Sequence, residues 1–152
     1  MTTRPDAVIL VVDDDPTTCA LTTTVLEREG YRTRYCTSGK EALELIETTP
    51  VSLVLLDVVM PSMDGFEVCA RLRATEKGKR LPVILLTGRD DMDTRLEGIQ
   101  SGVSEFLAKP VTRHELVARV RAQLHILDLT RQLEQVEQNL KSRPELRPIP
   151  PR

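Results

Sequence analysis

Carboxylate, hydroxyl and ammonium side chains stand where apolar runs of this sequence end. They are Asp13, Asp14, Asp57, Thr87 and Lys109. If these run ends meet in the fold, the carboxylates would repel one another by several kcal/mol at an effective dielectric constant of about 20. A divalent cation with oxygen ligands would relieve this repulsion, and a site that keeps water positions open for a phosphate favours Mg²⁺. The residue types therefore predict a magnesium site in which Thr87 and Lys109 contact an anion.

Five short apolar runs must position these side chains. The runs span 7–12, 31–36, 51–56, 82–86 and 104–108. Three are continuously apolar, which is typical of parallel strands that are covered on both faces. Helix signals separate the runs: Asp15 before Pro16 predicts an N-cap, and Ser38 and Thr112 each begin a capping box.

This alternation predicts an α/β fold. We expect a flavodoxin-like, doubly wound parallel sheet of five strands in the order 2-1-3-4-5, with helices on both faces and an extended C-terminal helix. In such sheets, ligands bind beyond the carboxyl ends of the strands, which is where the polar side chains lie.

Composition excludes several classes of protein. The 152 residues, 40% of them hydrophobic, can form one core and an appendage, and 21 Lys and Arg against 23 Asp and Glu give no strongly basic surface for nucleic acid. The basic run Arg71 to Arg80 is predicted to be a solvated helix end. The three cysteines are widely spaced, which fits free thiols in a reducing compartment. Without a signal peptide or a membrane-spanning run, we expect a cytoplasmic protein with no nucleic-acid or membrane partner.

The motifs in combination resemble the receiver domain of two-component response regulators. The resemblance covers residues 7–124 and rests on the acidic pair after the first run, D-x-x-M-P-x-M-D-G from Asp57 to Gly65, T-G at Thr87, and F-x-A-K-P from Phe106 to Pro110. It implies a signalling phosphoacceptor of the phosphorelay type that catalyses only its own phosphorylation and dephosphorylation. Its partner would be a sensor histidine kinase or a phosphotransfer protein.

The resemblance also implies the acceptor and the metal ligands. Asp57 would take a phosphoryl group from a phosphohistidine on the partner. The ligands of Mg²⁺ would be Asp13, Asp14, Asp57 and the backbone carbonyl of Val59, with Asp13 acting mainly through water. Val59 and Arg89 occupy positions that tune hydrolysis in the family. Neither offers a carboxylate or amide to orient water, so we expect a phosphorylated state that lasts minutes or more.

The remaining implied roles concern the phosphoryl oxygens and the switch. Thr87 and Lys109 would hold the phosphoryl oxygens, and Gly88 would leave room above them. The Lys109–Pro110 peptide bond would be cis. Thr87 and Phe106 would form the switch that alters the face made by the fourth helix, fifth strand and fifth helix. Phe106 has no hydroxyl, so this switch would depend on packing.

A different class of protein also fits the first acidic stretch. "VVDDDPT" matches D-x-D-x-T, the nucleophile motif of haloacid-dehalogenase-like phosphatases, with Asp13 as nucleophile and Asp15 as acid/base. Those enzymes place an acidic pair after the lysine, whereas only scattered acids follow Lys109. The phosphatase interpretation would also leave Asp57 unexplained. We therefore favour Asp15 as a helix cap.

The residues after Thr112 predict one helix that continues to about Lys141. Apolar residues follow a 3-4 spacing over about two heptads. They are Ile126, Leu129, Leu133, Val136 and Leu140. We expect this seam to form the coiled-coil stem of a parallel homodimer, although packing back on the same domain remains open.

The expected organisation is a receiver domain over residues 1–124, a helical extension over 125–141, and an extended, proline-rich tail over 142–152. No output domain follows in this sequence. The chain would act alone through a partner, or would be part of a longer protein such as a cyclic-dinucleotide enzyme or a hybrid kinase.

Overall fold

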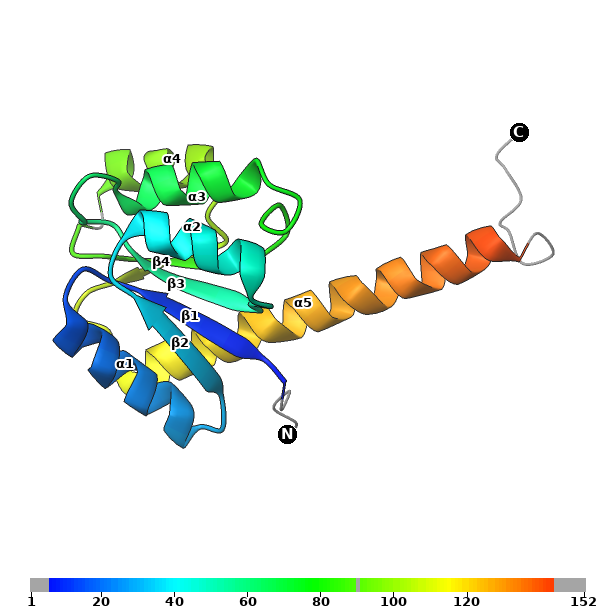
Figure 1. The fold of residues 1–152 in the computed structure, drawn as a ribbon, viewed down its shortest axis with the longest axis horizontal. Coiled ribbons are helices and arrows are strands. Elements are labelled where there is room, and N and C mark those ends of the chain that lie inside the picture. Colours follow the sequence, from blue (N-terminus) through cyan, green and yellow to red (C-terminus); the bar gives the residue numbers. More distant parts are fainter. Residues whose placement is uncertain (1–5, 90, 144–152) are drawn as a thin grey trace.

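The computed structural model describes residues 6–89 and 91–143, which form one parallel sheet covered by helices. The sheet order is β2-β1-β3-β4-β5, which confirms the predicted fold class and strand order. The strands are β1 (Val8–Val12), β2 (Arg32–Cys36), β3 (Leu53–Asp57), β4 (Val83–Thr87) and β5 (Glu105–Ala108). The helices are α1 (Pro16–Arg28), α2 (Gly39–Thr48), α3 (Gly65–Arg73), α4 (Met92–Ser101) and α5 (Arg113–Ser142). Helices α2, α3 and α4 cover one face of the sheet, and α1 and α5 cover the other (Figure 1).

The continuous apolar runs are explained by two core layers. Alternate residues of a strand face opposite sides of the sheet. In β3, Val54 and Leu56 join the cluster beneath α2 and α3, whereas Leu53 and Leu55 join the cluster with α1 and α5. All four side chains are fully buried. A polar residue within β3 would therefore be buried on either face, and polarity is confined to the strand end.

Each helix begins at a side chain that accepts a hydrogen bond from the first turn. The caps are Asp15, Ser38, Asp64, Asp91 and Thr112, for α1 to α5 in order. Three of them were expected from the capping signals, and all satisfy backbone N–H groups that a helix leaves unpaired. The caps define where each helix starts after its strand, and so define the length of the loops that carry the polar residues.

The strand register brings the polar residues to one edge of the sheet. The residues before Asp13 and Asp57 pair with each other between β1 and β3. Thr87 pairs with the residue before Lys109 between β4 and β5. Because all the strands are parallel, their carboxyl ends lie at the same edge.

Helix α5 has two parts with different surroundings. As far as Leu127 it packs against the sheet, and beyond that residue it extends away from the domain (Figure 1). Four residues of the predicted seam are largely exposed: Ile126 52%, Leu129 46%, Leu133 70% and Val136 56%. The helix ends at Ser142, one residue into the predicted tail, and residues 144–152 of that tail lie outside the described residues. Within residues 6–89 and 91–143, no helix is both long and apolar enough to span a bilayer.

The opposite edge of the sheet is organised by Arg73 at the end of α3. Its guanidinium donates hydrogen bonds to three backbone carbonyls and one hydroxyl. The acceptors are Gly78 O at 2.7 Å, Leu81 O at 2.5 Å, Gly102 O at 2.8 Å and Ser104 Oγ at 3.3 Å. The basic run was predicted to be a solvated helix end, and for Arg73 this was wrong, because its side chain joins the segments that precede β4 and β5.

Candidate acidic pocket at the carboxyl ends of the strands

The ends of β1 and β3 bring three carboxylates together. Asp13 and Asp14 follow β1, Asp57 ends β3, and each of the three can offer an oxygen within 4.8 Å of the others. Asp13 and Asp57 are buried, whereas Asp14 is exposed. Three like charges at this separation are unfavourable without a cation. The donor set consists of hard oxygens, which suits Mg²⁺ or Ca²⁺ better than a softer metal ion.

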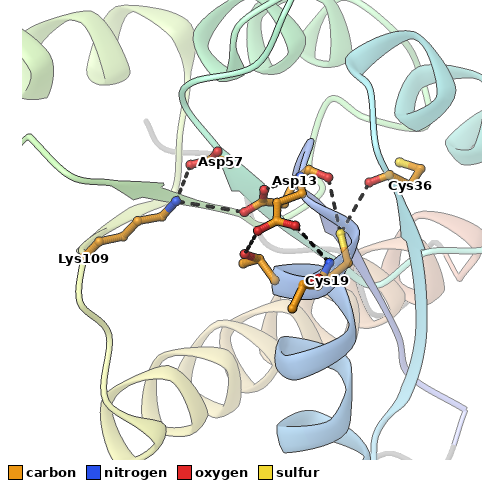
Figure 2. Close-up of polar contacts among 8 residues, drawn as sticks. Asp13, Cys19, Cys36, Asp57 and Lys109 are labelled. Atoms are coloured by element: carbon orange, nitrogen blue, oxygen red, sulfur yellow. Dashed lines mark hydrogen bonds and ion pairs between the residues drawn. The ribbon is translucent and has the colours of Figure 1, made fainter.

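Lys109 supplies one positive charge to this cluster. Its Nζ lies 2.7 Å from Asp57 Oδ1 and 3.9 Å from Asp13 Oδ2 (Figure 2). Its backbone N–H donates to Thr87 O at 2.7 Å, which fixes the loop after β5 to the end of β4. The Lys109–Pro110 peptide bond is cis. One ammonium group beside three carboxylates leaves the pocket with a net negative charge.

Asp13 is held in place by backbone contacts. Asp13 Oδ1 accepts the Asp15 N–H at 2.9 Å. Burial raises the pKa of the Asp13 carboxyl, the Asp57 charge adds to this effect, and the Asp15 hydrogen bond and Lys109 oppose it. The Cys19 thiol donates to the Asp13 carbonyl at 3.3 Å and lies 3.8 Å from the Cys36 carbonyl (Figure 2). The sequence carried no signal for this role of Cys19.

Thr87 ends β4 beside the carboxylates, and its hydroxyl is bonded within its own loop. Thr87 Oγ1 donates to Arg89 O at 3.0 Å and accepts the Arg89 N–H at 2.9 Å. Beside it, a side chain added at Gly88 would meet no atom within 4 Å. The loop above the pocket is therefore open to an incoming group at Gly88, and the Thr87 hydroxyl can reach such a group only by releasing Arg89.

The loop after Asp57 is shaped by close backbone contacts. Gly65 N–H donates to Val58 O at 2.9 Å, and a Cβ at Gly65 would overlap the Asp57 carbonyl oxygen. Only glycine fits this approach, which explains the D-G pair in the motif. Val59 lies in the same loop with its side chain exposed. Phe106 is separate from the acidic cluster, since it lies on β5 and packs against the core beneath α2 and α3.

The third acid of the first stretch has a different use. Asp15 Oδ1 accepts the Thr17 N–H at 3.0 Å, and Asp15 Oδ2 accepts the Thr18 hydroxyl at 2.9 Å. Both carboxylate oxygens therefore cap α1. This geometry argues against Asp15 as the acid/base of a phosphatase, and it accounts for three consecutive acids as two for the pocket and one for the helix.

Sequence comparisons identify similar proteins. A family model for the response regulator receiver domain matches residues 9–121. Response regulator MprA of Mycolicibacterium vanbaalenii is 43% identical over 116 residues, which are 76% of this chain and 49% of MprA. Transcriptional regulatory protein AfsQ1 of Streptomyces coelicolor is 41% identical over 118 residues, 78% of this chain and 51% of AfsQ1. The chain spans about half the length of the curated relatives it matches.

Solved structures agree with this result. The receiver domain of sensor histidine kinase PA1611 from Pseudomonas aeruginosa, which holds a magnesium ion in its active site cleft, matches with a TM-score of 0.73 and 30% identity over 78% of this chain and 98% of that chain. A CheY-like receiver protein from Methanospirillum hungatei matches with a TM-score of 0.77 and 26% identity, covering 82% and 98%. These matches give no support to the phosphatase alternative.

Proposed function

Because this chain belongs to the receiver domain family of two-component response regulators, we propose that it is a signalling phosphoacceptor whose Asp57 takes a phosphoryl group from a phosphohistidine. The donor would be a sensor histidine kinase or a phosphotransfer protein. The observation that carries the proposal is the buried Asp57 carboxylate, 2.7 Å from the Lys109 ammonium, at an edge of the sheet that also holds two further carboxylates.

The donor set fits Mg²⁺. Asp13, Asp14 and Asp57 can each turn an oxygen toward a common point, and Lys109 alone cannot neutralise them. These three residues, with the backbone carbonyl of Val59, would hold the ion. When bound, Mg²⁺ would supply positive charge to the phosphoryl oxygens as charge shifts between donor and acceptor.

The chain's own residues would divide the transfer between them. An Asp57 carboxylate oxygen attacks phosphorus, and an O–P bond forms as the P–N bond to the donor imidazole breaks. The electron pair of the broken bond stays on that nitrogen, and the donor leaves as neutral imidazole when its other ring nitrogen carries a proton. Lys109 would turn from Asp57 to a phosphoryl oxygen, and Thr87 would give up its bond to the Arg89 carbonyl to donate to another.

Loss of the phosphoryl group would be slow. Water must be oriented toward phosphorus for hydrolysis of the acyl phosphate. The side chain of Val59 is apolar, and the Arg89 guanidinium, a cation with no acceptor, is 3.1 Å from Asp91 Oδ2. Neither can accept a proton from water. We expect the phosphorylated state to last minutes or more, and the chain to catalyse only its own phosphorylation and dephosphorylation.

The outer part of α5 would form the stem of a parallel homodimer. Its apolar seam, from Ile126 to Leu140, faces away from the surface that carries Leu124 and Leu127, which are buried against the sheet. Because Ile126 and Leu133 expose half or more of their surface, a second stem offers the cover that this domain does not. The output controlled by this dimer would belong to a partner or to a further part of a longer protein.

Intact mass after incubation with Mg²⁺ and acetyl phosphate tests the acceptor. The parent chain should gain one phosphoryl group, and Asp57→Asn should gain none. Asp93→Asn, an exposed acid in the first turn of α4, is the matched control and should behave like the parent. Chelation of Mg²⁺ should prevent the gain. Phosphorylation of Asp57→Asn, or no gain in a parent chain that binds Mg²⁺, would contradict the proposal.

A further inference from the structure

The ring of Phe106 is packed against a glycine of α4. Gly98 is buried in the middle of this helix. A Cβ added at Gly98 would overlap Phe106 Cζ and would lie 2.5 Å from Cε1 and 3.1 Å from Cε2. Real Cβ atoms do not approach other atoms so closely. The ring therefore occupies the space that any side chain at position 98 would need.

Two other groups complete the surroundings of this ring. The guanidinium carbon of Arg95, three residues before Gly98 on α4, lies 5.7 Å from the ring centroid. A cation at this distance over an aromatic face is attracted to it. The ring also contacts the core cluster that contains Leu85 and Val83 of β4. Phe106 is thus held between the backbone of α4, the Arg95 side chain and the core.

The ring has reached this position while Thr87 remains bonded within its own loop. Leu85 pairs with Phe106 and Thr87 pairs with Ala108, so Thr87 and Phe106 lie on the same face of adjacent strands. The Thr87 hydroxyl still donates to Arg89 O and accepts from Arg89 N. The space for the ring therefore comes from the missing side chain at Gly98, and movement of Thr87 is not needed to create it.

We propose that Gly98 is a positioning residue that lets Phe106 pack beneath α4 before any phosphoryl group is present. A ligand can shift an equilibrium only by its difference in affinity for the two states. If the ring is already packed in the free chain, phosphorylation of Asp57 has little left to change at Phe106. The face made by α4, β5 and α5 then has its packed form in both states. This inference goes beyond the proposed function and rests on it only where a phosphoryl mimic is used.

The ring can be followed directly because the sequence contains only two phenylalanines, Phe66 and Phe106. Labelling with ring-¹³C phenylalanine gives two sets of aromatic signals without a steric change, and Phe66→Leu assigns them. In the parent chain without Mg²⁺ or a phosphodonor, we expect nuclear Overhauser effects between the Phe106 ring and the Gly98 Hα protons. We also expect weak relaxation of the ring signals by a soluble gadolinium chelate. Mg²⁺ with beryllofluoride, a stable phosphoryl mimic, should shift these signals little.

Gly98→Ala should reverse this behaviour. The added methyl group should expel the ring, so that the gadolinium chelate relaxes the Phe106 signals at least several-fold faster while the Phe66 signals are unchanged. Alanine is a better helix former than glycine, so α4 itself is not weakened. Gln100→Ala, an exposed change in the same helix, is the matched control and should leave both rings as in the parent. If Gly98→Ala does not fold, Arg95→Ala removes one side of the enclosure without adding atoms and should increase relaxation in the same direction.

Two results would overturn the inference. One is a parent Phe106 ring without contact to Gly98, or as accessible to the chelate as in Gly98→Ala. The other is a parent ring whose signals shift on addition of Mg²⁺ and beryllofluoride as far as those of Gly98→Ala do. Failure of the proposed function looks different, because then beryllofluoride would change nothing at the Asp13 and Asp57 signals in any variant, while the contact between Phe106 and Gly98 would still be observed.

Discussion

Two cations, Lys109 and Arg73, lie at opposite edges of the same sheet and have opposite surroundings. Lys109, at the carboxyl edge, contacts the carboxylates of Asp57 and Asp13, in a cluster with more negative than positive charge. Arg73, at the amino edge, donates to three carbonyl oxygens and one hydroxyl and has no carboxylate among its hydrogen-bond partners in the described residues.

The difference separates a group that stabilises the fold from a group that prepares a site. The guanidinium of Arg73 satisfies carbonyls of two loops that have no strand partner there, so it contributes to the folded state alone. Lys109 only partly neutralises its carboxylates, so the carboxyl edge gains stability when a further cation binds. Polar groups whose needs are met indicate architecture, and a cluster with unbalanced charge indicates function.

The largest expected effect on stability is at the amino edge. Arg73→Ala removes four hydrogen bonds and leaves part-buried carbonyls unpaired, so it should lower the free energy of unfolding by about 3 kcal/mol. Urea denaturation measures this change. Arg71→Ala, which breaks only an exposed ion pair with Glu67, is the matched control and should cost less than about 0.5 kcal/mol. Equal losses in the two variants would mean that Arg73 does not join the loops as described.

The second effect concerns Mg²⁺ at the carboxyl edge. At a concentration about 100 times the dissociation constant, Mg²⁺ should raise the free energy of unfolding of the parent chain by about 2.7 kcal/mol. Arg73→Ala should gain as much as the parent, since its defect lies at the other edge. Asp13→Asn should gain far less, because one carboxylate of the cluster is lost. Thermal unfolding with and without Mg²⁺ measures both, and a full gain in Asp13→Asn would remove Asp13 from the site.

The carboxyl edge could be predicted largely from the sequence, for a physical reason. Parallel strands place all their carboxyl ends at one edge, so the order of strands suffices to bring Asp13, Asp57 and Lys109 together. The helix caps are equally local, because Asp15 or Ser38 bonds only within the next turn. Neither inference needs the position of one element against another.

The amino edge and the Phe106 contact could not be predicted in this way. Arg73 belongs to a run of basic residues, and nothing in that run shows which side chain turns inward to meet the carbonyls of a segment about 29 residues later. The contact between Phe106 and Gly98 depends on how closely α4 approaches β5, which neither segment determines alone. For α5, the seam was visible in the sequence, but its exposure follows only from where the sheet ends.

The third prediction removes charge from the carboxyl edge in the absence of metal. Asp13 is buried beside Asp57 and carries a charge that Lys109 does not fully balance. In a solution with a chelator, Asp13→Asn should therefore raise the free energy of unfolding by about 1 kcal/mol, while its side-chain oxygen can still accept the Asp15 N–H. Urea denaturation beside Asp93→Asn, an exposed acid that should change little, measures this effect. Destabilisation of Asp13→Asn would mean that Lys109 already balances the cluster.

The smallest effect is the response of the two edges to salt. Repulsion among carboxylates is screened by mobile ions, whereas the hydrogen bonds of Arg73 to carbonyls involve no second formal charge. With a chelator present, adding KCl should raise the free energy of unfolding of the parent chain by about 0.5 kcal/mol more than that of Asp13→Asn. The same addition should affect Arg73→Ala as it affects the parent, because the acidic cluster is intact in both. Urea denaturation at low and high KCl gives the comparison. If Asp13→Asn kept the full salt response, the repulsion would lie elsewhere on the surface, and the two edges would not differ in the way proposed.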